Sequence, residues 1–325
     1  MSRYLIKKAG MYLAILFGVT VIIFGMMMCM PGDPYSYLYA DPNITEEQIE
    51  MKRAEYGLND PVYVQYYKWL GRLLHGDLGK TSDGRETSVL VWNALKNTLL
   101  LTVPSFILST VIAVILGIYS AMHASKWFDK MVTMFTFLEV SIPTFFLALF
   151  CVKVFCHDFK LLPASGLHTL GIAKGSSKYI SDSFRHMILP VAILTVTQIS
   201  SMLRYTRSSM INVLNEDYIR TARAKGLTKR QAVLRHGVHN ALLPIITVFC
   251  MRLPGILSGA LFTETVFVWP GIGTLNYNSI VGRDYMVIIA IATMLAVVIL
   301  LTNLLADILY AVADPRIRLE RRSVS

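Results

Sequence analysis

Charged residues are scarce in this sequence. Only 16% of its 325 residues are Asp, Glu, Lys or Arg, whereas 54% are hydrophobic. Soluble domains contain roughly 25% charged and about 45–50% apolar residues. This balance argues against a water-soluble fold, because the excess apolar side chains exceed what one core can bury. It indicates a protein whose surface faces lipid.

Cysteine is also rare, and no cysteine has a neighbour at the C-x-x-C spacing of zinc or dithiol sites. We expect buried free thiols at the four positions, which all lie in or beside apolar runs: Cys29, Cys151, Cys156 and Cys250. The 20 glycines and 12 prolines are too few for a collagen-like or Pro/Gly-rich disordered chain.

Catalytic and nucleotide-binding motifs are missing. The sequence has no G-x-x-x-x-G-K-[ST] loop for ATP, no H-E-x-x-H and no G-x-S-x-G. His236 and His239 lie three residues apart, without an evident third metal ligand. We therefore expect no ATP-binding loop of this kind in the chain, while spacing alone leaves a Ser/His/Asp triad open.

Six apolar runs are long enough to cross a hydrocarbon core of about 30 Å as helices. The first is longer than a signal-peptide core and no A-x-A-like site follows it, so we expect it to be retained. The sequence thus predicts an all-α integral membrane protein with six transmembrane helices, at residues 11–30, 98–119, 131–154, 187–203, 242–262 and 286–312.

The distribution of basic residues predicts the orientation. With the N-terminus inside, the cytoplasmic segments hold 17 Lys and Arg in 72 residues, and the outer segments hold 12 in 119 residues. Cytoplasmic loops carry this excess in membrane proteins. The surplus of basic residues therefore indicates membrane topology rather than nucleic acid, and both termini should face the cytoplasm.

Two polar segments are too large to be simple connections. Residues 31–97 contain a helical stretch at 45–56 and several Gly and Asp turns, which predict a small extracytoplasmic subdomain. The expected organisation is an N-terminal helix (1–30), this subdomain, a five-helix core (98–312) and a cytoplasmic tail (313–325).

The second polar segment, residues 204–241, has clear helix signals. Residues 217–225 are good helix formers that end at Gly226, and Thr228 with Gln231 forms a capping-box pattern. The second helix should run as far as Pro244. We expect a pair of short basic helices on the cytoplasmic side.

Proline and glycine signals inside the spans are weaker. Prolines at 104, 143, 190, 244 and 254 could break helices, as in transporters, or simply pack within them. The pair Gly255 and Gly259 favours a close helix contact.

Two charges lie deep in the predicted spans. Glu139 and Arg252 should both lie roughly 12–14 Å into the membrane, since each is eight or nine residues from the inner end of its helix. They could form an intramembrane ion pair, or they could line a translocation path and contact a charged substrate group. So few buried charges favour a pore subunit energised by partners over a self-contained ion-coupled carrier or intramembrane enzyme.

The loop at 217–227 resembles the EAA loop of binding-protein-dependent ABC importer permeases, in the form used by the dipeptide, oligopeptide and nickel group. Arg220-Thr221-Ala222 stands where the general pattern has Glu-Ala-Ala, a departure that this group shares. The chain is most similar to the B-type permease subunit. The resemblance also includes Pro31-Gly32-Asp33-Pro34, Tyr56-Gly57-Leu58, Gly76-Asp77-Leu78-Gly79, Ser141-Ile142-Pro143-Thr144-Phe145, Glu264-Thr265-Val266-Phe267, Trp269-Pro270-Gly271-Ile272-Gly273, Arg283-Asp284-Tyr285 and Asp314-Pro315-Arg316-Ile317-Arg318.

This resemblance implies the type I ABC importer permease fold in a bacterial cytoplasmic membrane, with no catalytic residue and no cofactor in this chain. It implies alternating access driven by partners: a second homologous permease, two ATP-binding subunits that hold ATP and Mg, and an extracytoplasmic substrate-binding protein. The substrate could be a peptide, a nickel chelate, an opine, glutathione or an oligosaccharide, with peptides favoured. The implied ATPase-coupling residues are Asp217, Tyr218, Arg220, Thr221, Ala222, Lys225, Gly226 and Leu227.

Overall fold

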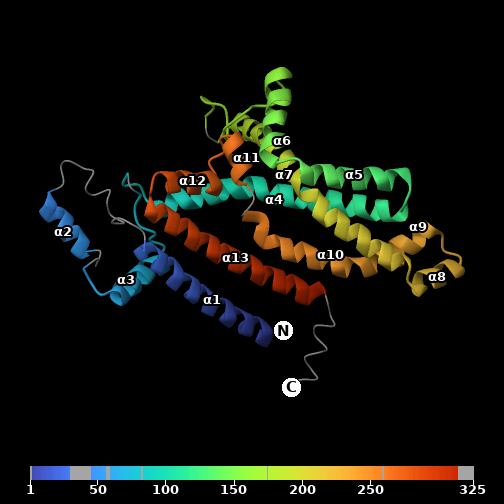
Figure 1. Ribbon diagram of the computed structural model, residues 1–325, viewed down its shortest axis with the longest axis horizontal. Coiled ribbons are helices and arrows are strands. Elements are labelled where there is room, and N and C mark those ends of the chain that lie inside the picture. Colours follow the sequence, from blue (N-terminus) through green and yellow to red (C-terminus); the bar gives the residue numbers. More distant parts are fainter. Residues whose placement is uncertain are drawn as a thin grey trace. The chain divides into compact units, whose positions relative to one another are not determined.

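The computed structural model (Figure 1) describes residues 2–29, 45–55, 59–81, 83–173, 175–257 and 260–313. The regular secondary structure within these ranges is helical, apart from an isolated bridge between Lys80 and Glu86, and turns and loops connect the helices. Four quoted features lie partly or wholly outside the described residues: the segment at 31–34, the helix end at 56–58, Gly259 and the tail at 314–325. The chain divides into two compact units, Met1–Thr98 with Pro270–Leu304, and Leu99–Trp269 with Leu305–Ser325.

Four helices are long and apolar enough to cross a membrane by themselves, among the described residues. Two bent helix pairs raise the number of spans to as many as six. The fold is thus an all-α membrane protein, as predicted. Several helices extend beyond the apolar runs that predicted them: α1 (Ser2–Cys29), α4 (Thr87–Met122), α7 (Ser177–Leu214) and α13 (Tyr285–Ala313).

The third predicted span, at 131–154, is broken rather than continuous. Helix α5 (Trp127–Ser141) ends before Pro143, and α6 (Thr144–Cys151) continues through the π-helical segment η2 (Val152–Asp158) at an angle of 99°. Ile142 adopts extended backbone angles, φ −95° and ψ 119°, as the residue before a proline prefers. Pro143 then starts α6, where its missing N–H costs nothing.

The other prolines do not end their helices. Pro104 lies inside α4, Pro190 inside α7 and Pro244 inside α10 (Val238–Arg252). The expected helix end at Pro244 is therefore wrong, because α10 bends there by 45° and continues. Pro254 lies in the short 3₁₀ segment η4 (Leu253–Leu257).

The first unit is built on α1, α2 (Glu46–Glu55), α3 (Val62–Leu74), α12 (Ile272–Val281) and the first part of α13. Phe24 of α1 packs against Trp69 of α3, with ring centroids 5.6 Å apart, and against Ile289 of α13. The hydroxyl of Tyr66 lies 3.0 Å from that of Thr20, which fixes α3 against α1. These contacts join the segment after the first span to the first and last long helices.

The predicted turns of residues 76–84 are confirmed. Gly76, Gly79 and Gly84 have φ of +78°, +82° and +80°, in the left-handed region that glycine enters without strain. Asp83 accepts hydrogen bonds from Thr81 and Arg85. These bonds, chiefly the one from Arg85, lower the pKa of Asp83 to about 2.

The second unit has α7 at its centre. Helices α5 and α10 both pack against α7, and Figure 1 shows α7 running beside α10. Its core is a cluster of small and aliphatic side chains from α4, α5, α7 and α10 that includes Ala113, Val132, Met202, Leu203 and Ile245. Small residues allow close helix contacts in membranes.

The cysteines are free thiols, but the expectation that all are buried is wrong. Only Cys250 is buried, whereas Cys29 is exposed at the end of α1 and the other two are half-buried. The exposed thiol lies on a helix that packs against its unit along one side only.

The contact between α4 and α7 should not accommodate an alanine at Gly117. A Cβ atom there would lie 2.8 Å from Cβ of Thr206 and 3.1 Å from the carbonyl oxygen of Leu203. We expect Gly117→Ala to lower the free energy of unfolding by roughly 1–3 kcal/mol through overpacking. The measurement is thermal unfolding of the purified chain in detergent, followed by circular dichroism.

The matched control is Gly25→Ala in α1, where a Cβ would meet nothing within 4 Å. Alanine is the better helix former, so this variant should be neutral or stabilised by up to about 1 kcal/mol. Equal unfolding temperatures for the two variants would contradict the close contact.

Candidate functional site

The predicted coupling loop, residues 204–241, begins as the last turns of α7 and continues as α8 (Asp217–Ala224). Ile219 and Ala222 of α8 are buried against Ala232, and Leu227 packs on this cluster. The apolar residues recur at a spacing of three, which places them on one face of the helix. The loop therefore has a small core of its own.

Helix α8 ends in a complete Schellman motif at Gly226, which confirms the predicted helix end. The N–H of Gly226 donates to the carbonyl of Arg223 over 3.0 Å, and the N–H of Leu227 donates to that of Ala222 over 3.3 Å. Gly226 has φ +91°. This pattern, with contact between the residue after glycine and the last helical turn, is the geometry that glycine permits at helix ends.

The capping box after Gly226 is also confirmed. The backbone N–H of Gln231 donates to the hydroxyl of Thr228 over 3.3 Å, and the side-chain oxygen of Gln231 accepts from the N–H of Thr228 over 3.0 Å. The box starts α9 (Lys229–Ala232), which continues through the π-helical segment η3 (Val233–Gly237) into α10. The expected pair of short helices is thus one short helix and one long, irregular helix.

The structure separates the predicted coupling residues into two groups. Ala222 and Leu227 face the core of the loop, and Gly226 shapes its turn. The other predicted residues are exposed: Asp217, Tyr218, Arg220, Thr221 and Lys225. The side chains of this second group are accessible to a partner protein.

The exposed face of α8 is polar and mixed in charge. The guanidinium of Arg220 lies 3.5 Å from the carboxylate of Asp217, one helical turn away. Partial burial, and then the nearby Glu216, raise the pKa of the Tyr218 hydroxyl, which stays neutral at physiological pH. Such a face is suited to hydrogen bonding with a protein surface.

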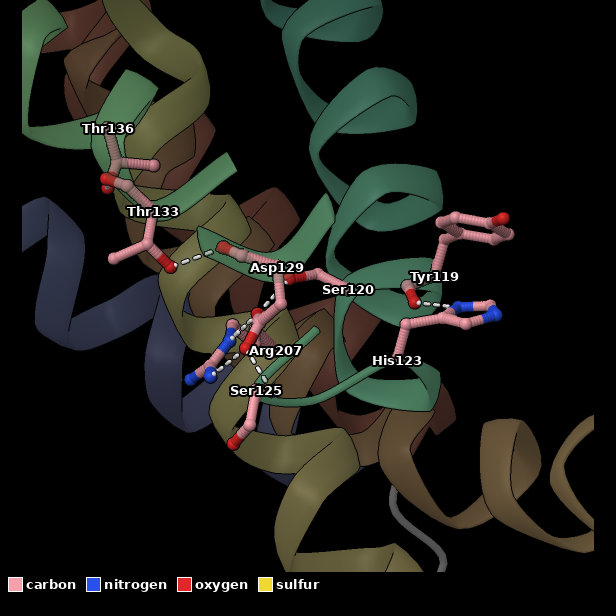
Figure 2. A network of polar contacts seen from close by, with 8 residues as sticks. All are labelled: Tyr119, Ser120, His123, Ser125, Asp129, Thr133, Thr136 and Arg207. Atoms are coloured by element: carbon pink, nitrogen blue, oxygen red, sulfur yellow. Dashed lines mark hydrogen bonds and ion pairs between the residues drawn. The ribbon is translucent and has the colours of Figure 1, made fainter. Parts of the chain in front are cut away.

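A network centred on Asp129 lies at the base of the loop, and sequence reasoning missed it (Figure 2). Asp129, in the first turn of α5, is only 3% exposed. Arg207 of α7 donates to both oxygens of its carboxylate, from Nε over 2.6 Å and from Nη2 over 2.8 Å. The hydroxyl of Ser120, near the end of α4, donates to the same carboxylate.

The turn between α4 and α5 is part of this network. The N–H of Ser125 donates to Asp129 over 2.8 Å, and Ser125 has φ +65°, an unfavourable angle for a residue with a side chain. Figure 2 shows Ser120, Ser125 and Arg207 converging on the one carboxylate. The sequence held one signal for this network: Asp129 lies in a short basic turn between two predicted spans, and Arg207 follows the end of the next span.

Glu139 and Arg252 do not form an ion pair with each other in the part of the chain that the structure describes. The carboxylate of Glu139 accepts from the N–H of Ser200 over 3.2 Å, and Nη2 of Arg252 donates to the carbonyl of Gln198 over 2.8 Å. The guanidinium also lies over the ring of Phe106, 5.6 Å from its centroid. Both charges are therefore held against the backbone of α7.

Comparison with known proteins places the chain in one family. Residues 113–319 match the family described as binding-protein-dependent transport system inner membrane component, and residues 1–89 match the N-terminal domain described for the same system. The chain is 41% identical over 319 residues to the oligopeptide transport system permease protein AppB of Bacillus subtilis, covering 98% of this chain and 99% of that protein.

Two further relatives are similar over the same extent. The dipeptide transport system permease protein DppB of Escherichia coli K12 is 32% identical over 339 residues, and the glutathione transport system permease protein GsiC of Shigella flexneri is 34% identical over 319 residues. Each match covers 98% of this chain and 99% of the relative.

Replacement of Gly226 should impair coupling without preventing folding. A Cβ atom at position 226 would meet no neighbour within 4 Å, so the cost of Gly226→Val arises chiefly from φ +91°, at roughly 1–2 kcal/mol. The end of α8 should shift or extend. We expect transport by the assembled complex to fall several-fold while the chain still inserts, measured in proteoliposomes.

The control is Gly171→Val, since Gly171 has φ +88° and equally open surroundings outside the coupling loop. This variant has the same backbone strain and should transport normally. Wild-type transport by Gly226→Val would contradict the role of the turn.

Removal of the charge on Asp129 should destabilise the helix junction. Asp129→Asn leaves Arg207 without its carboxylate, and charge-assisted hydrogen bonds contribute roughly 1.5–3 kcal/mol. We expect a loss of that size, measured by denaturant unfolding in detergent. Asp158→Asn is the matched control, because Asp158 is more exposed and, among the residues that the structure describes, its side chain bonds only to His157. The double variant Asp129→Asn/Arg207→Gln should recover part of the loss; no recovery would contradict the pairing.

Proposed function

The chain belongs to the family of binding-protein-dependent transport system inner membrane components, and from this premise we propose that it imports peptides as one half of a transmembrane pore. The relatives named above are permeases for oligopeptides, dipeptides and glutathione, and each aligns along almost the whole chain. All three substrates contain peptide or peptide-like bonds. This full-length similarity is the observation that carries the proposal.

The chain is a multi-pass inner-membrane permease subunit and not an enzyme. ATP hydrolysis therefore belongs to other subunits. We assign ATP and Mg to two partner ATPases, and the second half of the pore to a homologous permease. The alternative of a self-contained ion-coupled carrier or intramembrane enzyme does not agree with the family.

The exposed face of α8 is the surface that we assign to an ATPase. Ile219 and Ala222 anchor the helix, so Asp217, Tyr218 and Arg220 project from a rigid unit. A rigid helix transmits displacement, whereas a flexible loop would absorb it. Movement of a docked ATPase would thus move α8 as a body.

Helix α7 can carry that movement into the membrane. Only Asn215 and Glu216 separate α8 from α7, and Arg207 ties α7 to the Asp129 junction. Helices α5 and α10 pack on α7. A shift of the coupling loop would therefore reach the helices that carry Glu139 and Arg252.

We assign Glu139 and Arg252 to the translocation path. Charged side chains within a membrane face protein or water and mark substrate routes. The two side chains do not form an ion pair with each other among the described residues, where Nη1 of Arg252 also has no hydrogen-bond partner. A peptide carries both a terminal carboxylate and a terminal ammonium that could contact such groups.

The remaining assignments concern the two sides of the membrane. We place both termini and the coupling loop in the cytoplasm, because basic residues concentrate there. The subdomain 31–97 and the segment 264–285 would then receive a substrate-binding protein outside. Tyr66 and Trp69 fix helix α3 of this subdomain to α1, which would give such a partner a firm surface.

The test is transport of labelled dipeptides by the reconstituted complex with its binding protein. The wild type should accumulate peptide only with ATP. Arg220→Glu should lower transport and peptide-stimulated ATP hydrolysis together, by about tenfold or more, because it reverses charge at the proposed contact. Arg235→Glu, an exposed position in η3, is the control and should retain activity. Uptake of nickel chelates but not of peptides would overturn the substrate assignment and leave the permease assignment intact.

A further inference from the structure

An open hollow lies between the end of α4 and the segment that follows α9. It holds about 750 Å³ and is lined by Ile115, Ile118, Tyr119, Met122, His123, Lys126, Arg230 and Leu234. No part of the coupling face of α8 lines it. The mechanism described above leaves this hollow without a role.

The lining has an ordered chemistry. Ile115, Ile118 and Met122 follow α4 towards its end, over roughly 10 Å at the rise of a helix. His123 and Lys126 come next, in the turn, and Arg230 joins them from α9. An apolar wall thus leads to a cationic end, and the lining includes no acidic residue.

The cationic side chains of the hollow have no acidic partner among the described residues. Neither Lys126 nor Arg230 forms an ion pair in the described ranges, where the nearby Asp129 is engaged by Arg207. His123 has a partner, since its Nδ1 lies 3.0 Å from the carbonyl oxygen of Tyr119. The two positive charges lie beside apolar side chains that are also exposed, with Ile115 60% and Leu234 55% exposed. A ligand with both an anionic group and an apolar part would match this lining.

We infer that this hollow binds an anionic phospholipid, with the phosphate at Lys126 and Arg230 and an acyl chain along Ile115 and Ile118. Basic pockets beside transmembrane helices on the cytoplasmic side hold such headgroups, and that leaflet is the negatively charged one. The inference rests on the proposed orientation, which places this end of α4 at the cytoplasmic surface. A bound lipid would join α4 to the base of the coupling loop.

A protein partner fits the lining less well. A partner surface would need an acidic patch at the two cations and an apolar ridge along α4, a helix whose sequence has the length and hydropathy of a membrane span. Lipid supplies both parts in that order at every position around the protein. We therefore commit to lipid, and a protein occupant becomes an outcome of the test.

The experiment uses the assembled importer, washed free of lipid in detergent and titrated with phosphatidylglycerol or phosphatidylethanolamine. Bound lipid is counted by native mass spectrometry. The variant is Lys126→Gln/Arg230→Gln, and the control is Lys130→Gln/Arg235→Gln, which removes two exposed positive charges close in sequence that do not line the hollow. Removal of two basic residues from an anionic site should weaken phosphatidylglycerol binding by roughly 30-fold.

The control should bind phosphatidylglycerol as the wild type does, and phosphatidylethanolamine should bind weakly to all three proteins. Equal phosphatidylglycerol binding by variant and control would overturn the inference. A photo-crosslinking amino acid placed at position 234 should react with lipid; a crosslink to a partner subunit in the assembled importer would also overturn it. Peptide transport is measured on the same samples, so a failed lipid site with intact transport leaves the proposed function standing.

Discussion

The carboxylate of Asp129 holds three helices at one point. It accepts from Ser120 of α4, from the backbone of the following turn and from both donors of Arg207 on α7. A buried carboxylate is costly unless its lone pairs are satisfied, and here four donors satisfy it. Because α7 leads within two residues into α8, the position of the coupling loop depends on this junction.

The predicted coupling loop is a second rigid element, besides the junction at Asp129. Its core of Ile219, Ala222, Ala232 and Leu227 closes around the left-handed turn at Gly226. The remaining residues of α8 are exposed. This division explains how a helix of only eight residues can keep a defined shape, since isolated helices of that length are unstable in water.

The two charged side chains within the spans form hydrogen bonds with backbone groups and no ion pair with each other, among the described residues. Glu139 and Arg252 bind Ser200 and Gln198, two residues apart on α7. Helix backbone groups are normally occupied by their own ladder, so these contacts are secondary ones that a conformational change could exchange. The break at Pro143, just beyond Glu139, gives α5 a free end from which such a change could start.

The sequence alone determined the class, the apolar segments and the local geometry of the coupling loop. These features depend on neighbours in the chain: hydropathy over about twenty residues, a glycine after a helix, and a threonine three residues before a glutamine. Tertiary structure decided which proline broke a helix, since Pro104, Pro190 and Pro244 lie inside helices and only Pro143, among these four, separates two. It also decided the partners of Asp129 and Arg252. The contact of Asp129 with Arg207 joins residues 78 positions apart, and that of Arg252 with Gln198 joins residues 54 positions apart. Such pairing is set by how the helices pack, which no local pattern specifies.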